Sequence, residues 1–454
     1  MSPFGFGPPD DNNSGNSNNP DNSGDSGNFN FNEMMAKMQS EFQKIAPGFM
    51  GFGNSQLFSP AQGALPKEVI REVAKQFIQT QGSQPVGAND QAKCDEAFSI
   101  ANTWLDNATV FPQVAFDHSA ISPIDWLNIS IDGWHSTFEP LAVGLTEAVT
   151  KLIEEATKAM QGENLEGADA NLAAQLGPMG HILRSFIGTM LATQMGQTIG
   201  ALAGASKGAH DAALPIVTHS KPSLLPQVLR KFGEELEIPE TEIAIYFALR
   251  EAATVRLFEG NPWLVSYMKA AIAEYGKGIH IDLDAIQRQA EDAMRNMDID
   301  ISDIENMSSQ NAEQFTIALN NGLFTPEESP QQAAALEKLE TALALIEGWI
   351  EEVITLAASD RLPSLNALTE LLRRERVSNT PLQQLFKALF NLEVSPRHAR
   401  KAAFFWYEVR KNRDIDSRDK IWSGILPTEK ELSDPLAFIS STEIPDDLSG
   451  LFGE

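Results

Sequence analysis

Apolar residues at helical spacing are the feature that most constrains the fold of this chain. Between residues 69 and 79, apolar residues recur at i, i+1, i+4, i+5 and i+8, which places them on one face of a helix: Val69, Ile70, Val73, Ala74 and Phe77. Regular alternation of apolar and polar residues, which is typical of half-buried strands, is nearly absent. The sequence therefore predicts an all-α, predominantly helical body. The same helical pattern returns in the segments 91–107, 141–160 and 171–204.

The two ends of the chain differ in composition from this body. Residues 1–32 are almost entirely Asn, Asp, Gly, Ser and Pro. They cannot bury enough apolar surface to offset the entropy of ordering, so we expect a disordered tail. Residues 33–58 indicate a short helix and a Gly-rich linker, residues 59–440 the helical domain, and residues 441–454 an acidic C-terminal tail.

The net charge of the chain excludes some partners. With 62 acidic and 34 basic residues, the charge is −28 at pH 7. Such a surface disfavours non-specific binding to nucleic acid, so we expect no nucleic-acid partner. A single cysteine, Cys94, excludes an internal disulfide framework, and the first 32 residues hold no apolar segment of a secretion signal. Both features predict a cytoplasmic protein.

The most apolar stretch, residues 182–205, is interrupted by Arg184, Gln194 and Gln197. A membrane helix needs about 20 consecutive apolar residues, so we expect no membrane insertion. The same region carries glycines at Gly196, Gly200, Gly204 and Gly208. This spacing predicts one small-residue face of a helix, which lets another backbone approach closely.

Basic residues gather in one part of this acidic chain. Residues 361–420 hold 13 basic and 7 acidic residues, and the cluster Arg373-Arg374-Glu375-Arg376 is among the densest. Two interpretations stay open. The cluster is either a solvated helical face that complements acidic surface elsewhere in the protein, or a binding site for an acidic partner.

The histidines give little sign of a metal site. No two of the seven stand three or four positions apart, so no single helix presents two imidazoles to one metal ion. His210, next to Asp211 in a predicted loop, is the best of a weak set. The Gly-x-Ser-x-Gly motif of serine hydrolases is also absent.

The segment 249–264, Leu-Arg-Glu-Ala-Ala-Thr-Val-Arg-Leu-Phe-Glu-Gly-Asn-Pro-Trp-Leu, is the most informative for function. It lies on a helix predicted to start after Pro239. It closely resembles the signature of an actinobacterial family of zincin-like hydrolases that are usually classed as zinc-dependent metalloproteases. The resemblance covers roughly residues 60–440 and implies a zincin-like helical domain with the helix 242–258 at its centre. Further similar segments are 274–278, 321–324, 339–349 and 360–363.

The resemblance also implies where the site should lie. In the family this segment contains His-Glu-x-x-His, whose histidines bind zinc and whose glutamate is the general base. Here the two ligand positions are Arg250 and Thr254, and only Glu251 matches. A third ligand from a downstream helix would be Glu347. The motif is therefore degenerate, and Glu251 is interpreted as a vestigial general base.

The chemistry of these replacements argues against a zinc enzyme. Catalytic zinc needs three protein ligands, and a protonated guanidinium cannot be one of them. We expect no bound zinc and no conventional zinc peptidase activity, although relatives with the intact motif would bind zinc. Two classes of function remain: a hydrolase with a substituted or relocated site, and a non-catalytic binding or scaffold protein with a protein or peptide partner.

Arg250 suggests a structural hypothesis. Its guanidinium could lie between Glu251 and Glu347, in the place of the metal charge, and join two helices by charge-assisted hydrogen bonds. The competing interpretation is an exposed pair of charges one helical turn apart, which would contribute only about 0.3 kcal/mol.

Overall fold

The computed structural model of this chain describes residues 63–279, 329–377 and 398–441 with short gaps, and the isolated positions 383, 385–387 and 394. The expected N-terminal tail, the linker segment and residues 442–454 lie outside the described residues. The gaps fall at 116, 162–168, 212–213, 215, 218–220, 235 and 425.

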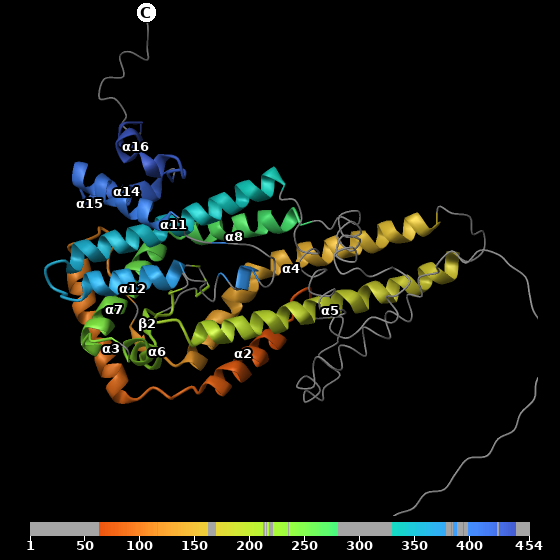
Figure 1. The fold of residues 1–454 in the computed structure, drawn as a ribbon, viewed down its shortest axis with the longest axis horizontal. Helices are drawn as coiled ribbons and strands as arrows, with labels where there is room; N and C mark the ends of the chain where they lie inside the picture. The colour runs from red at the N-terminus through yellow and green to blue at the C-terminus, as the bar shows by residue number, and fades with distance from the viewer. Residues whose placement is uncertain are drawn as a thin grey trace, which may run out of the picture. The chain divides into compact units, whose positions relative to one another are not determined.

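The described chain is predominantly helical, as expected from the sequence (Figure 1). Its only strands are two residues long each, β1 (Ser119–Ala120) and β2 (Ser223–Leu224). The helices are α2 (Lys67–Gln81), α3 (Ala88–Leu105), α4 (Pro123–Gln161), α5 (Asp169–Ala203), α6 (Pro226–Gly233), α7 (Glu240–Gly260), α8 (Trp263–Lys277), α11 (Pro330–Ala358), α12 (Leu365–Val377), α14 (Ala399–Asn412), α15 (Ile415–Lys420) and α16 (Pro435–Ser441), with short 3-10 turns at Ile421–Ser423 and Glu431–Ser433.

Helix α4 begins much earlier than the predicted segment 141–160 and passes through Pro140. Its first half has an apolar stripe of its own, because Trp126, Trp134 and Phe138 are buried on it. Burial of these aromatic rings stabilises the helix on the N-terminal side of the proline, where propensity alone indicates a break.

Helix α5 packs closely on α2 through its glycines. A Cβ added to Gly196 would lie 2.8 Å from the carbonyl oxygen of Ile70, and one added to Gly200 would lie 2.8 Å from Phe77. The prediction of tight helix packing is confirmed at these two positions. It is wrong for Gly204 and Gly208, because α5 ends at Ala203 and the chain turns away.

Helix α7 is the central helix of the described chain. Every residue from Tyr246 to Leu257 is buried, which requires neighbours on all sides. These neighbours are α3, α6, α11 and α12. The predicted helix 242–258 is therefore confirmed in position, and its bounds extend by a few residues at both ends.

Helix α11 brings a second set of residues against α7. Ser329 caps its first turn by accepting a hydrogen bond from the backbone N–H of Gln332, and Pro330 occupies the first helical position. Close approach of α14 is possible at Gly348, where an added Cβ would lie 2.5 Å from the backbone nitrogen of Ala403. Trp349 of α11 and Trp406 of α14 are fully buried in this contact region.

The two short strands form a parallel pair, with Ser119 opposite Ser223 and Ala120 opposite Leu224. On its other side, Leu224 bridges Gly208 in antiparallel fashion. This small arrangement fixes the chain after α5 against the chain before α6, directly beside α7. None of the described helices is both long and apolar enough to span a membrane.

Candidate functional site

Glu251 of α7 lies in a fixed cradle of hydrogen-bond donors. Its Oε2 accepts from the backbone N–H of His210 at 3.0 Å, and its Oε1 accepts from the backbone N–H of Ser223 at 3.0 Å. The Nδ1 of His210 lies 2.8 Å from the same Oε1. The carboxylate is only 3% exposed. Both of its oxygens are therefore engaged with the protein.

A glycine makes this cradle possible. A Cβ added to Gly208 would lie 2.5 Å from Oε2 of Glu251. Cβ atoms in proteins do not approach another atom this closely, so a larger residue would displace the carboxylate. The backbone N–H of Ala209 donates to the carbonyl of Ser223 at 3.1 Å, so the two donor segments are held together. The sequence showed Gly208 only as part of a glycine repeat, and its role beside Glu251 depends on tertiary structure.

Arg250, the next residue on α7, faces α11. Its Nη2 donates to Oε2 of Glu347 at 2.8 Å, and both residues are more than nine-tenths buried. Glu347 is also paired with Arg376 of α12. Arg376 in turn lies 3.2 Å from Oδ1 of Asp211. We call Arg250, Glu347, Arg376 and Asp211 the Glu347 cluster; it joins α7, α11, α12 and the loop after α5.

The structure tests the expected placement of Arg250. Its pairing with Glu347 is confirmed, and the two helices are joined as the hypothesis required. The other half of that hypothesis is wrong, because the Glu251 carboxylate is bound by His210 and Ser223 and not by the guanidinium. An exposed i, i+4 pair is also excluded, since the pair is buried.

Thr254 occupies the second expected ligand position. Its hydroxyl donates to the carbonyl oxygen of Arg250 at 2.8 Å, one turn back along α7. This is the usual way in which a buried threonine satisfies its hydroxyl within a helix. The side chain is 4% exposed.

Charges around the Glu347 cluster shift two pKa values. Burial favours the neutral form of Asp211, but Lys207, Arg376 and the backbone N–H of Lys207 outweigh it and hold the pKa of this carboxyl below its usual range. Burial, together with the nearby Arg250, lowers the pKa of Arg376 to about 10. At neutral pH, Asp211 and Arg376 are therefore oppositely charged partners.

The space enclosed by these groups is small. It measures about 10 Å³ and is lined by residues of both sets, including Gly208, Phe247, Arg250 and Glu251. One water molecule needs a cavity of about this size. In the described part of the chain, no three His, Cys, Asp or Glu side chains gather so that they could hold a metal ion.

Sequence reasoning identified part of this site. It singled out Arg250, Glu251, Thr254 and Glu347, which the structure places around one point. It did not find the partners of these residues, Ser223 and Arg376 among them. Arg376 belongs to a basic cluster for which a solvated helical face is one interpretation. In the fold, the side chain of Arg376 contacts Glu347 and Asp211 instead.

The comparisons with known proteins agree with the helical fold. A family model described as Zincin-like metallopeptidase matches residues 67–439. A crystal structure from Chloroflexus aurantiacus, described as that of "a putative hydrolase with a novel fold", superposes with a TM-score of 0.54 at 16% identity and covers 84% of this chain and 100% of its own. At this identity the likeness concerns the fold alone. No curated protein matches the chain.

Proposed function

Since this chain belongs to the zincin-like metallopeptidase family, we propose that it is a member that works without catalytic zinc, as a non-catalytic binding or scaffold protein. The observation that carries this proposal is the pairing of Glu347, the candidate third ligand, with Arg250 and Arg376. The proposed partner is a protein or peptide, and the single cysteine supports a cytoplasmic location.

The residues at the family's zinc position do not fit zinc. Arg250 carries a permanent positive charge and has no lone pair to offer. The Thr254 hydroxyl is committed to a helix carbonyl. Binding a metal ion to Glu347 would require it to displace or lie beside two guanidinium groups, which repel a cation. We therefore derive no chemical step through a metal ion.

Glu251 is also poorly placed to act as a general base. A base must reach the proton that it removes, directly or through one water. Each Glu251 oxygen already accepts a hydrogen bond from a backbone N–H, and the enclosed space has no room for a substrate. We propose that this glutamate now has a structural role, which is to fix the loop 207–211 against β2.

A metal-independent hydrolase is the second candidate. The His210–Glu251 contact favours it, because a carboxylate that orients an imidazole is part of many hydrolytic sites. The name of the Chloroflexus structure points the same way. This candidate requires the cavity of about 10 Å³ to open before a substrate can enter.

Metal analysis and activity together test the proposal. The full chain is produced in zinc-containing medium, purified without added zinc or chelator, and analysed by inductively coupled plasma mass spectrometry. We expect far less than one zinc per chain and no hydrolysis of a fluorescent casein substrate. Stoichiometric zinc with peptide cleavage that a chelator stops would refute the proposal. Cleavage that a chelator does not affect, and that His210→Ala abolishes, would support the second candidate.

A matched variant tests the reason for the absence of zinc. Arg250→His with Thr254→His restores the two imidazoles at the family spacing beside Glu347. We expect this double variant to retain more zinc than the parent chain. Adding Glu347→Gln should reduce that gain. If the double variant folds and still binds no zinc, Arg250 and Thr254 do not explain the difference.

A further inference from the structure

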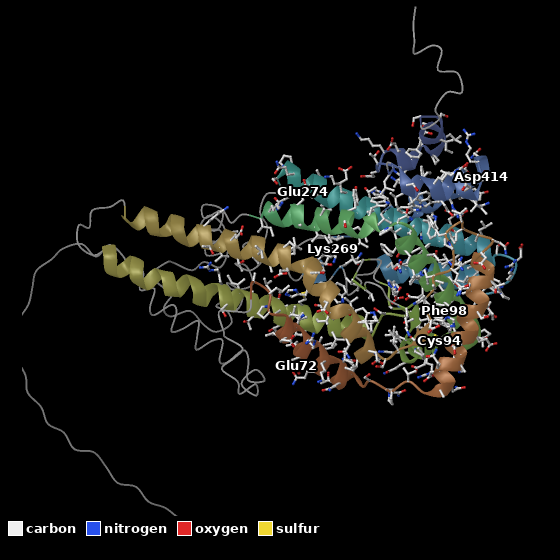
Figure 2. All side chains as sticks on the ribbon, turned by 180° about the vertical axis from the view of Figure 1, so that it is seen from behind. Glu72, Cys94, Phe98, Lys269, Glu274 and Asp414 are labelled. Carbon is white, nitrogen blue, oxygen red and sulfur yellow. The ribbon has the colours of Figure 1, made fainter. Side chains whose placement is uncertain are left out.

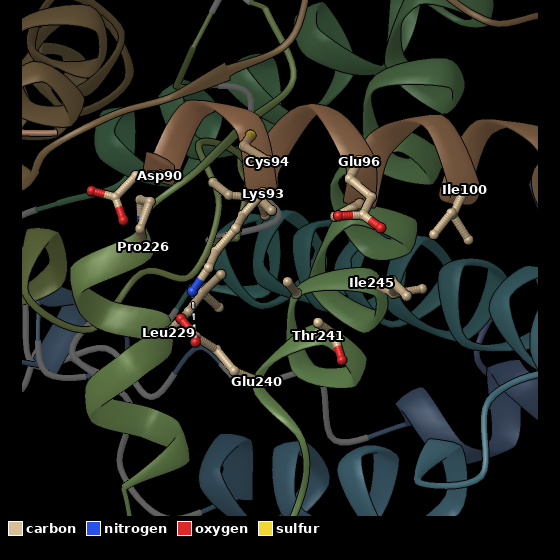
Figure 3. Close-up of a pocket in the computed structure, with 13 residues that line it drawn as sticks. Asp90, Lys93, Cys94, Glu96, Ile100, Pro226, Leu229, Glu240, Thr241 and Ile245 are labelled. Carbon is tan, nitrogen blue, oxygen red and sulfur yellow. Dashed lines mark hydrogen bonds and ion pairs between the residues drawn. The ribbon is translucent and has the colours of Figure 1, made fainter. Parts of the chain in front are cut away.

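A separate cavity lies between α3, α6 and α7 (Figure 3). Its volume is about 70 Å³. The walls are mainly aliphatic, with contributions from all three helices. Its aliphatic lining includes Ala97 and Ile100 from α3, Leu229 from α6, and Ala244 and Ile245 from α7. An aliphatic cavity of this kind favours an apolar occupant.

Cys94 contributes a sulfur atom to the same wall. The residue is 3% exposed, and burial raises the pKa of its thiol to about 12. The group therefore stays neutral at physiological pH and behaves as a small apolar side chain. It is unsuited to nucleophilic chemistry here, so the cavity is better understood as a binding site than as a second active site.

The rim of the cavity is acidic. Asp90 pairs with Arg230 at 2.7 Å, and Glu240 pairs with Lys93 at 2.8 Å, so these two carboxylates are compensated. Glu96 lines the same cavity, and its exposed carboxylate has no ion pair within the described residues. Figure 3 shows it extending from α3 toward α7, over the space between the helices. The rim therefore carries one uncompensated negative charge, that of Glu96.

We propose that this cavity binds a small aliphatic ammonium ion, with the alkyl group inside and the ammonium group beside Glu96. The size sets the alkyl group: an apolar cavity of about 150 Å³ accommodates the six carbons of benzene, so a cavity of about 70 Å³ suits a branched chain of about three carbons. The uncompensated carboxylate sets the charge, because it attracts a cation and repels a carboxylate ligand.

Saturation-transfer NMR on the full chain tests the proposal with isopropylammonium chloride as the probe. Isopropanol and isobutyrate carry the same isopropyl group on an uncharged hydroxyl and on a negatively charged carboxylate. We expect the strongest transfer for the ammonium compound, weaker transfer for the alcohol and none for the carboxylate. Equal transfer to all three compounds, or none to the ammonium compound, would overturn the proposal.

Two variants locate the binding. Ala244→Leu fills the cavity and should abolish transfer, and Ala97→Leu does the same from α3 if the first variant fails to fold. Glu96→Gln should weaken binding about threefold, as expected for a partly exposed ion pair. The matched control is Glu72→Gln, the same change on exposed Glu72 of α2, away from Cys94 (Figure 2). Loss of binding in this control, or full binding in Ala244→Leu, would place the probe elsewhere.

The only cysteine gives an independent measurement. Methylthiolation of Cys94 by methyl methanethiosulfonate forms a methyl disulfide and releases methanesulfinate. Followed by intact-mass spectrometry, it reports access to the cavity without interference from any other thiol. Isopropylammonium should slow this modification, and an equal concentration of methylammonium should not. Equal rates with both ammonium ions would contradict occupation of the cavity.

Discussion

Two groups of buried charged side chains hold the helices together, and they satisfy their charges in different ways. In the Glu347 cluster, charged side chains pair with one another, and two guanidinium groups share one carboxylate. The second group, the Asp419 cluster, consists of Asp419, Arg418, Trp349 and Thr109. There, Asp419 accepts hydrogen bonds at 2.7–2.9 Å from Thr109, from the backbone of Val110, from Trp349 and from Arg418.

The two clusters differ in the groups that surround their buried carboxylates. Asp419 is fully buried, and both of its oxygens accept well-formed hydrogen bonds, mostly from groups without a formal charge. This arrangement is a structural joint between α11, α15 and the loop after α3. The Glu347 cluster instead places opposed charges around one point between α7, α11, α12 and the loop after α5. Under the proposed function, these charges stand in the place of a metal ion.

The largest expected effect is at Asp419. Asp419→Ala leaves the buried Arg418 with Glu352, at 4.0 Å, in place of a hydrogen-bonded carboxylate, and removing one member of a buried pair costs about 3–5 kcal/mol. The free energy of unfolding from urea denaturation measures it. Asp419→Asn is the matched control, because it keeps the size and one acceptor, and it should cost less. A loss of stability no greater than that of the control would contradict the structural role of the charge.

Arg250→Ala should have a smaller effect. Arg376 still pairs with Glu347 in this variant, so we expect a loss of about 2 kcal/mol, typical of a hydrogen bond between charged groups. A double-mutant cycle with Glu347→Ala separates the pair from the loss of packing. An unchanged melting temperature for Arg250→Ala would show that the ion pair does not stabilise the contact between α7 and α11.

The pH dependence of stability should have opposite signs at Asp211 of the Glu347 cluster and at Glu352, which lies 4.0 Å from Arg418 of the Asp419 cluster. The pKa of Asp211 is lowered on folding, so the unfolded chain takes up its proton first. The contribution of Asp211 is therefore present above its ordinary value of 3.8 and is lost as pH falls through the lowered folded pKa. Asp211→Asn should flatten the acid limb of a stability-against-pH curve.

Glu352 beside the Asp419 cluster should behave in the opposite way. Burial raises the pKa of Glu352 although Arg410 pairs with it. The folded chain then holds the proton more tightly than the unfolded chain, so its contribution is greatest below 4.5 and declines as pH rises through the folded pKa. Glu352→Gln should remove this decline. If both variants change the curve with the same sign, the assigned pKa directions are wrong.

The sequence predicted elements well where local pattern and packing agree. The apolar stripe of α2 and the central position of α7 follow from periodicity and from the family resemblance. A proline normally ends a helix, but α4 continues through Pro140 because burial of aromatic residues around Trp134 stabilises it. Local signals cannot report a stabilising contact that comes from distant parts of the chain.

The site shows the same limit. Arg250, Glu251, Thr254 and Glu347 were all singled out by the family resemblance, the first three because they occupy the His-Glu-x-x-His register on one helix. Ser223 binds Glu251 through its backbone N–H, which every residue except proline possesses, so no sequence signal marks it. Arg376 and Asp211 are far apart in the chain, and only the fold brings them together.

The smallest expected effect comes from Arg374, two positions from Arg376 in the same basic cluster. Its side chain is 74% exposed and pairs with Glu370 one turn away on α12, so solvent and salt screen the interaction. Arg374→Ala should leave the urea midpoint unchanged within error, whereas Arg376→Ala should lower it clearly, because it leaves Asp211 and Glu347 with fewer partners. Equal effects of the two substitutions would mean that the basic cluster acts through its total charge. Unequal effects would attribute the stabilisation to the one guanidinium that α12 turns toward the site, and would explain why counting charges in this region fails to predict either stability or a binding surface.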